Sequence, residues 1–163
     1  MVQYFPDMKP VLVNSDGNLP DGTRDVTLNT PVPREVEVIA TAYQGASGKG
    51  RAFRAIFEIV RALGAKVCVV VDSDLRSITP EWIELLAGPI VKEGYGYVTP
   101  YYNRHKYDST ITNNICYPMT RMPYGLDVRQ PIGGDFGFSG QLLDHYLGQD
   151  VWQTDVACFG IDI

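Results

Sequence analysis

The sequence predicts an α/β protein in which helices flank a mixed sheet, and three observations support this fold class. The apolar run Val67–Val71 shows no alternation with polar residues, which is typical of a strand covered on both faces. Shorter apolar runs at Lys9–Asn14 and Val36–Ala40 are bounded by turn residues and favour two more strands. Apolar residues within Ala52–Leu63 recur at three- and four-residue spacing, as on one face of a helix. We therefore expect a strand, a helix and a strand joined by a right-handed crossover.

Turn residues separate these elements. Ser15–Thr23 reads as a loop, and its end at Asp21–Thr23 is expected to open a short helix. Thr30–Arg34 contains two prolines and predicts an extended connector. Gly64 follows the main helix, at the position where a left-handed glycine commonly ends a helix.

A second helix is expected after the buried strand, with Thr79 as N-cap and Pro80 at its first position. Its apolar side chains should face the sheet, and Gly88–Pro89 should break or kink it. These side chains are Trp82, Ile83, Leu85 and Leu86. Gly94–Tyr102 then predicts a strand that is interrupted or at an edge, because it contains Pro100.

The rest of the chain gives weaker patterns. Residues from Asn103 to Gln130 are expected to be irregular. A short strand should follow Gly133–Gly134, and Ser139 should cap a helix over Gln141–Leu147. Another apolar element begins at Phe159–Ile163.

Length and composition favour one domain over residues 1–163. The net charge of −5 argues against a broad nucleic-acid surface and leaves room for an anionic small ligand. No apolar run approaches the roughly 20 residues of a membrane span, and the first ten residues lack a signal-peptide core. We therefore expect a cytoplasmic protein without a transmembrane segment, and the sequence leaves a homodimer open.

Three cysteines, Cys68, Cys116 and Cys158, form no C-x-x-C pair, which fits a reducing compartment. Cys68 lies inside the apolar run, so we expect a small core residue rather than a nucleophile.

Two carboxylates, Asp72 and Asp74, follow the expected central strand, with Ser73 between them. In open α/β sheets ligands bind beyond the carboxyl ends of the strands. Close carboxylates repel each other unless a cation lies between them, and their oxygens suit Mg²⁺ or Mn²⁺ completed by substrate phosphates. The same triplet would serve as a solvated turn and helix cap, and by itself it leaves both interpretations open.

Lys49 stands between Gly48 and Gly50 at the start of the main helix. The stretch is too short for a P-loop, and no Ser or Thr follows the lysine. Alone it favours a helix-entry loop with an exposed lysine. Because the helix leads into the strand that ends at Asp72, Lys49 could also approach phosphates bound there.

Candidate acceptor residues lie further along the chain. Arg104, with Thr110 or Thr112, could hold a carboxylate or phosphate, since arginine forms paired hydrogen bonds to such groups; a solvated loop is the alternative. Asp135 could hydrogen-bond a sugar or acceptor, or cap a turn beside Gly133–Gly134. The two histidines, His105 and His145, are expected at the surface rather than on a metal.

Four motifs in one order resemble glycosyltransferases of the GT-A fold, in the broad family 2 group. The resemblance is to retaining enzymes of the glucosyl-3-phosphoglycerate synthase and mannosylglycerate synthase type. The motifs are Asn14–Asp16 with Asp21–Thr23, the glycine-lysine-glycine at Gly48–Gly50, the D-x-D motif Asp72–Asp74, and Gln130–Phe136. They cover nearly the whole chain.

This resemblance implies a metal-dependent, retaining transfer of a hexose from a nucleoside-diphosphate sugar to a small anionic acceptor such as phosphoglycerate or glycerate. The metal would be held by Asp72 and Asp74, and Asp135 would be the catalytic residue. Donor-binding residues would be Asn14, Ser15, Asp16, Lys49, Asp72 and Ser73. Acceptor-binding residues would be Arg104, Thr110, Thr112, Gly133 and Gly134.

The sequence departs from the family at both ends. The family's first strand is not found ahead of Met1–Pro6, and relatives place a metal-binding histidine beyond Ile163. We therefore expect a partial domain with little or no activity alone.

Alternatives stay open beside the glycosyltransferase. One is a non-catalytic module that binds a nucleotide or a partner, and another is a sugar nucleotidyltransferase, although its glycine-rich amino-terminal signature is not seen. A phosphatase of the haloacid-dehalogenase kind fits less well, because Leu75–Ser77 stands where that family expects Gly-Thr or Thr-Val.

Overall fold

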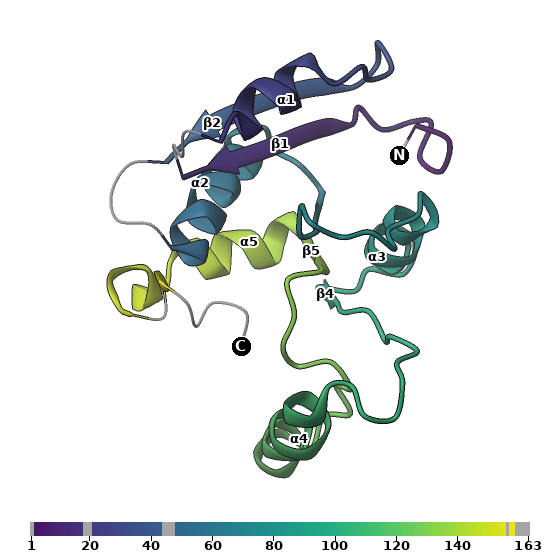
Figure 1. Cartoon of the computed structure of the whole chain (residues 1–163), viewed down its shortest axis with the longest axis vertical. Coiled ribbons are helices and arrows are strands. Elements are labelled where there is room, and N and C mark those ends of the chain that lie inside the picture. The colour runs from purple at the N-terminus through teal and green to yellow at the C-terminus, as the bar shows by residue number, and fades with distance from the viewer. Residues whose placement is uncertain (1, 18–20, 44–47, 156, 159–163) are drawn as a thin grey trace. The chain divides into compact units, whose positions relative to one another are not determined.

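A computed structural model describes residues 2–17, 21–43, 48–155 and 157–158 (Figure 1). The chain divides into two compact units. The first runs up to Ala65 and resumes at Leu143, and the second comprises Lys66–Leu142. The expected element at Phe159–Ile163 lies outside the described residues, and whether the chain acts as one domain stays a prediction.

A parallel pair of strands forms the sheet of the first unit. Strand β1 (Val11–Asp16) pairs with β2 (Glu37–Ala42), and helix α1 (Thr23–Asn29) connects them and contacts both. The helix begins as the sequence predicts, because Oδ1 of Asp21 accepts the backbone N–H of Thr23 at 3.0 Å. The parallel strand, helix and strand unit is therefore β1–α1–β2.

Helix α2 (Lys49–Ala62) contacts β1 and provides much of the core of this unit. Phe53, Phe57 and Val60 are buried on its apolar face. Gly64 has a φ of +61°, and its N–H donates to the Arg61 carbonyl, which confirms the predicted glycine cap.

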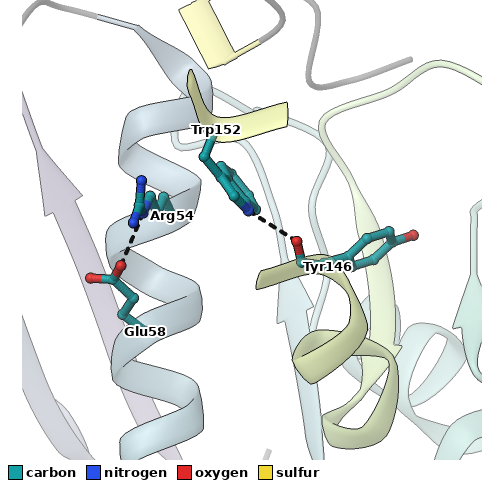
Figure 2. Close-up of polar contacts among 4 residues, drawn as sticks. All are labelled: Arg54, Glu58, Tyr146 and Trp152. Atoms are coloured by element: carbon teal, nitrogen blue, oxygen red, sulfur yellow. Dashed lines mark hydrogen bonds and ion pairs between the residues drawn. The ribbon is translucent and has the colours of Figure 1, made fainter. Parts of the chain in front are cut away.

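A second aromatic layer packs on α2. Helix α5 (Gly140–Leu147) supplies Tyr146, and the 3₁₀-helix η2 (Asp150–Gln153) supplies Trp152. The Phe57 ring lies 6.4 Å from the Tyr146 ring and 5.8 Å, edge on, from the Trp152 ring. Figure 2 shows the Trp152 indole N–H donating to the Tyr146 carbonyl at 2.9 Å, while the Arg54–Glu58 ion pair lies along α2.

A three-stranded antiparallel sheet organises the second unit. Its order is β3 (Val67–Val70), β5 (Phe136–Ser139) and β4 (Tyr97–Val98). The prediction that Val67–Val71 is a central strand is wrong for the described sheet, because β3 lies at its edge and β5 in its middle. Phe138 of β5 is 0% exposed, and β3 is only partly buried.

The expected crossover from the second strand to Val67–Val71 is also not found. In the described residues β2 pairs with β1, and β3 pairs with β5 in the other sheet. Apolar runs predict strands but do not select their partners. The strand predicted over Gly94–Tyr102 is only Tyr97–Val98; it lies at the edge of its sheet, as expected, and ends before Pro100. Ser139 Oγ accepts the Leu142 N–H at the start of α5, as predicted.

Helix α3 (Glu81–Glu93) differs from the sequence prediction at three points. It is not broken at Gly88–Pro89, where the segment is packed in the core, with Leu86, Ala87, Gly88 and Ile90 buried. Leu85 is 68% exposed and faces away from the core. The hydroxyl of Thr79 bonds the Glu81 carboxylate instead of capping the helix, whose N-cap is Pro80.

The segment expected to be irregular contains helical structure. A π-helical turn, η1 (Thr112–Cys116), leads directly into α4 (Tyr117–Tyr124). Pro118 lies at the start of α4, directly after the π-helical turn. In the described part of the chain, no helix combines the length and apolar character needed to cross a membrane.

Candidate functional site

The D-x-D carboxylates lie just beyond the end of β3. This strand stops at Val70, so Asp72 and Asp74 leave the sheet, as predicted. Asp72 is half-buried, whereas Ser73 and Asp74 are exposed. The second carboxylate therefore faces solvent, while the first is packed against the neighbouring strand.

Asp135 reaches this strand tip from the start of β5. Val70 lies opposite Phe136 in the antiparallel register, so the residues just outside this pair also meet. Oδ1 of Asp135 accepts the backbone N–H of Asp72 at 3.0 Å. Asp135 is 7% exposed, so this carboxylate is almost fully withdrawn from water.

Gly134 leaves room for the Asp72 carboxylate. A Cβ at position 134 would lie 2.2 Å from Oδ2 and 2.4 Å from Oδ1 of Asp72. Such contacts are impossible, so this position requires glycine while Asp72 keeps its rotamer. Beside it, the buried amide of Gln130 donates to the Ile132 carbonyl and fixes the turn that contains Gly133.

Tyr102 joins Asp72, Gly134 and Asp135 in what we call the Asp135 cluster. It is not among the residues predicted from sequence. Its hydroxyl donates to Oδ2 of Asp135. The ring lies 5.7 Å from that of Trp82, and the Arg104 guanidinium lies 4.5 Å from its centre. Burial raises the pKa of Tyr102, and the Asp135 carboxylate raises it further, so the hydroxyl keeps its proton and acts as a donor.

The acceptor candidates are only partly brought together. Arg104 is exposed, donates to the Ser109 hydroxyl, and joins the Asp135 cluster through the Tyr102 ring. Thr110 bonds the Tyr107 carbonyl at 3.3 Å, and Thr112 begins η1. The structure thus links Arg104 to Asp135 through Tyr102. For Thr110 and Thr112 no contact with this group is found among the described residues, and acceptor binding by them stays a prediction.

Both histidines lie at the surface. His105 packs on the Tyr107 ring at 5.3 Å, and His145 contacts Gln149. Among the described residues, no group of three or more His, Cys, Asp or Glu side chains is arranged to hold a metal. Two carboxylates at a strand tip nevertheless match the oxygen set of Mg²⁺, which commonly takes one or two carboxylates plus substrate phosphates.

Candidate donor residues in the first unit cluster at the end of β1. The Asn14 amide donates to the Thr27 hydroxyl at 2.7 Å, and Asp16 ends the strand. Ser15 Oγ is buried and has no hydrogen-bond partner among the described residues. An unsatisfied buried hydroxyl suits a polar ligand, because such groups are normally paired.

Lys49 is the first residue of α2, and its ammonium lies 5.6 Å from the Phe53 ring centre. The flanking glycines have a structural cause. A Cβ at Gly50 would lie 2.3 Å from the Ala157 carbonyl oxygen, and one at Gly48 would lie 3.0 Å from Cys158 Cα. The glycine-lysine-glycine pattern therefore reflects close packing of residues 157–158 on the helix start.

A pocket of about 600 Å³ lies elsewhere in the first unit. Arg51 and Arg54 of α2 and Trp152 of η2 contribute to its lining. It includes none of the predicted site residues. In the first unit the predicted residues are Asn14–Asp16 at the end of β1 and Lys49 at the start of α2, and in the second unit Asp72 meets Gly134 and Asp135.

Comparison with solved structures identifies the fold. No protein-family model and no curated protein sequence matches the chain. The mixed α/β arrangement is nevertheless that of GT-A glycosyltransferases, as the sequence predicts.

Two solved enzymes illustrate the match. Glucosyl-3-phosphoglycerate synthase from Mycobacterium tuberculosis, in complex with Mn²⁺, UDP-glucose and phosphoglyceric acid, is 22% identical with a TM-score of 0.58, covering 81% of this chain and 45% of that one. Mannosyl-3-phosphoglycerate synthase from Rubrobacter xylanophilus is 22% identical with a TM-score of 0.62, covering 80% and 43%. This chain therefore spans about half the length of these relatives.

Proposed function

We propose that this protein is a metal-dependent glycosyltransferase that moves a hexose from a nucleoside-diphosphate sugar to a small anionic acceptor. The observation that carries this proposal is the contact of Asp72 with Gly134 and Asp135 at the tip of β3. It places a D-x-D motif and a buried carboxylate together. Support also comes from the fold, which is shared with a synthase solved with Mn²⁺, UDP-glucose and phosphoglyceric acid.

The two D-x-D carboxylates share one role in this proposal. Asp74, exposed at the strand tip, and Asp72, seated over Gly134, would hold Mg²⁺ or Mn²⁺. When bound, the metal ion would supply Lewis-acid stabilisation of the leaving diphosphate. Ser73, beside them, would contact the donor.

Residues of the first unit would bind the rest of the donor. The Ser15 hydroxyl, which has no hydrogen-bond partner among the described residues, would form a hydrogen bond with the nucleotide. Asn14 and Asp16 would contact the same part of the donor. Lys49 would add positive charge near the diphosphate. These roles follow the family resemblance and are separately testable.

The proposed transfer retains the anomeric configuration, as the family resemblance implies, and Asp135 is assigned a positioning role in it. Both of its carboxylate oxygens already accept a hydrogen bond, from the Asp72 N–H and the Tyr102 hydroxyl, which suits a group that positions the sugar better than a nucleophile. In the proposed reaction the acceptor oxygen bonds to the anomeric carbon on the face from which the diphosphate leaves. The acceptor proton passes to the departing phosphate oxygen, so no protein nucleophile is needed.

Arg104 is the proposed contact for the acceptor anion, with Thr110, Thr112 and the turn at Gly133 alongside. Its guanidinium is exposed and lies over the ring of Tyr102, whose hydroxyl donates to Asp135. An acceptor anion bound by Arg104 would therefore lie near Asp135. Phosphoglycerate and glycerate carry the carboxylate or phosphate that arginine binds best.

Calorimetry tests donor binding directly. UDP-glucose and GDP-mannose are titrated into the protein with Mn²⁺, and Asp74→Ala should weaken binding at least tenfold. Asp108→Ala, which removes an exposed carboxylate in the same unit, should not. If neither nucleotide sugar binds, even to a chain completed to the length of the solved relatives, the proposal fails. Binding without sugar transfer in a product assay over a donor and acceptor panel would favour the non-catalytic nucleotide-binding module instead.

A further inference from the structure

We propose that Tyr102 is a positioning residue that fixes Asp135 in one rotamer and, through it, the tip of β3 that carries Asp72. Its effect on sugar transfer rests on the function proposed above, whereas its effect on the strand tip does not. Tyr102 lies 33 residues before Asp135 and 30 after Asp72, so only the folded chain brings the three together.

The buried carboxylate of Asp135 depends on few partners. One oxygen accepts the Asp72 N–H at 3.0 Å, and the other accepts the Tyr102 hydroxyl. A carboxylate that is 7% exposed cannot replace a lost partner with bulk water at little cost. The Tyr102 hydroxyl therefore fixes Oδ2 of Asp135, and this keeps Oδ1 oriented toward the Asp72 N–H.

The position of the Asp72 backbone in turn determines where its carboxylate lies. The Asp72 carboxylate occupies the space left by Gly134, where it lies too close for any side chain at that position. A shift of the Asp72 backbone would move the carboxylate out of this space. The Tyr102 hydroxyl, acting through Asp135 and the Asp72 backbone, would thus control where these oxygens stand.

The Tyr102 ring is held independently of its hydroxyl. Trp82 of α3 packs against it at 5.7 Å between ring centres, and Arg104 covers it at 4.5 Å. A cation over an aromatic face is attracted to it. The ring therefore supports the proposed acceptor arginine, and the hydroxyl supports the donor-side carboxylates.

These two contacts can be separated by substitution. Tyr102→Phe removes the hydroxyl and keeps the ring, and Tyr102→Leu removes both. Tyr101→Phe is the matched control, because Tyr101 is the adjacent residue, is 75% exposed, and contacts Arg129 through its ring. Each comparison changes one tyrosine in the same segment.

Amide hydrogen exchange in ¹⁵N-labelled protein measures positioning without any ligand. The Asp72 amide should exchange about tenfold faster in Tyr102→Phe than in wild type, as expected when a buried hydrogen-bond network loses one member. In Tyr101→Phe its exchange should stay unchanged. An unchanged Asp72 amide in Tyr102→Phe would overturn the inference whatever the activity.

Kinetics then separate this inference from the proposed function. In the active protein, Tyr102→Phe should lower kcat about tenfold with little change in the acceptor KM, whereas Tyr102→Leu should also raise the acceptor KM. Equal kinetics in Tyr102→Phe and Tyr101→Phe would overturn the catalytic part. Faster Asp72 exchange in a chain completed to the length of the solved relatives that transfers no sugar would support the positioning role and reject the glycosyltransferase.

Discussion

Asp135 accepts the backbone N–H of Asp72 across 63 residues of sequence, and this bond joins the D-x-D strand tip to the segment that precedes β5. The two residues belong to different predicted motifs. Their contact means that the D-x-D strand tip and the turn at Gly133–Gly134 form one structure. Several measurable consequences depend on this arrangement and on the packing around it.

Substitution of Gly134 should damage the strand tip specifically. In Gly134→Ala the new Cβ would lie 2.2 Å from an Asp72 oxygen, so the carboxylate must leave its position. We expect Mn²⁺-dependent nucleotide binding, measured by calorimetry, to weaken at least tenfold. Gly96→Ala is the control, because its Cβ meets no atom within 4 Å. Equal binding by both variants would contradict the seating of Asp72 over Gly134.

Gly50→Ala should destabilise the first unit. Its Cβ would lie 2.3 Å from the Ala157 carbonyl oxygen, which is backbone and cannot rotate away. Urea unfolding should show a loss of about 1–3 kcal/mol, the usual cost of overpacking. Gly148→Ala, whose Cβ would make ordinary contacts at 3.6 Å, should stay within about 0.5 kcal/mol of wild type. A tolerated Gly50→Ala would mean that residues 157–158 do not pack on the helix start.

Two adjacent leucines of α3 offer a matched comparison. Leu86 is 2% exposed and Leu85 is 68% exposed. Leu86→Ala should cost about 2–5 kcal/mol of unfolding free energy, because it leaves a cavity in the core. Leu85→Ala should change it by about 0.5 kcal/mol or less. Similar losses for both variants would restore the original prediction that both side chains face the sheet.

The Cys68 thiol should make stability depend on alkaline pH. Burial raises its pKa from 9.0 to about 12. Between these values the unfolded chain loses the thiol proton while the folded protein keeps it, so stability falls as pH rises, by at most about 1.4 kcal/mol per pH unit. Below pH 9 the contribution is fully present.

Urea unfolding of wild type and Cys68→Ala across this range isolates the effect. The difference between the two unfolding free energies should shift against wild type as pH increases. The other alkaline titrations are shared by both proteins and cancel. A difference that is independent of pH would show that the Cys68 thiol is not desolvated.

Local patterns were sufficient to predict much of the fold. The helical spacing and the final glycine of α2 are encoded within one segment, as are the Ser139 cap of α5 and the strand that stops before Asp72. Strand pairing is harder to predict, because the sequence of an apolar strand does not indicate which other strand it hydrogen-bonds to. Placing β5 rather than β3 in the middle of its sheet requires knowing that Phe138 is the more deeply buried residue.

The candidate site shows the same division. Asp72, Asp74 and Asp135 are identifiable from residue type and motif, but Tyr102 is one of ten tyrosines and carries no motif of its own. Its role comes from the reach of a hydroxyl across the fold. The glycines beside Lys49 have a structural cause in the close approach of Ala157, which the sequence does not reveal, and the donor-binding role of Lys49 stays a prediction.

The antiparallel pairing of β3 with β5 has a kinetic consequence. The segment between Asp72 and Asp135 must close as a long loop before β3 can pair with β5, and such closure slows folding. The carboxylates at the strand tip thus reach their final positions only when this late, non-local step is complete. Refolding experiments should recover metal binding with the slow phase that forms the sheet, and never ahead of it.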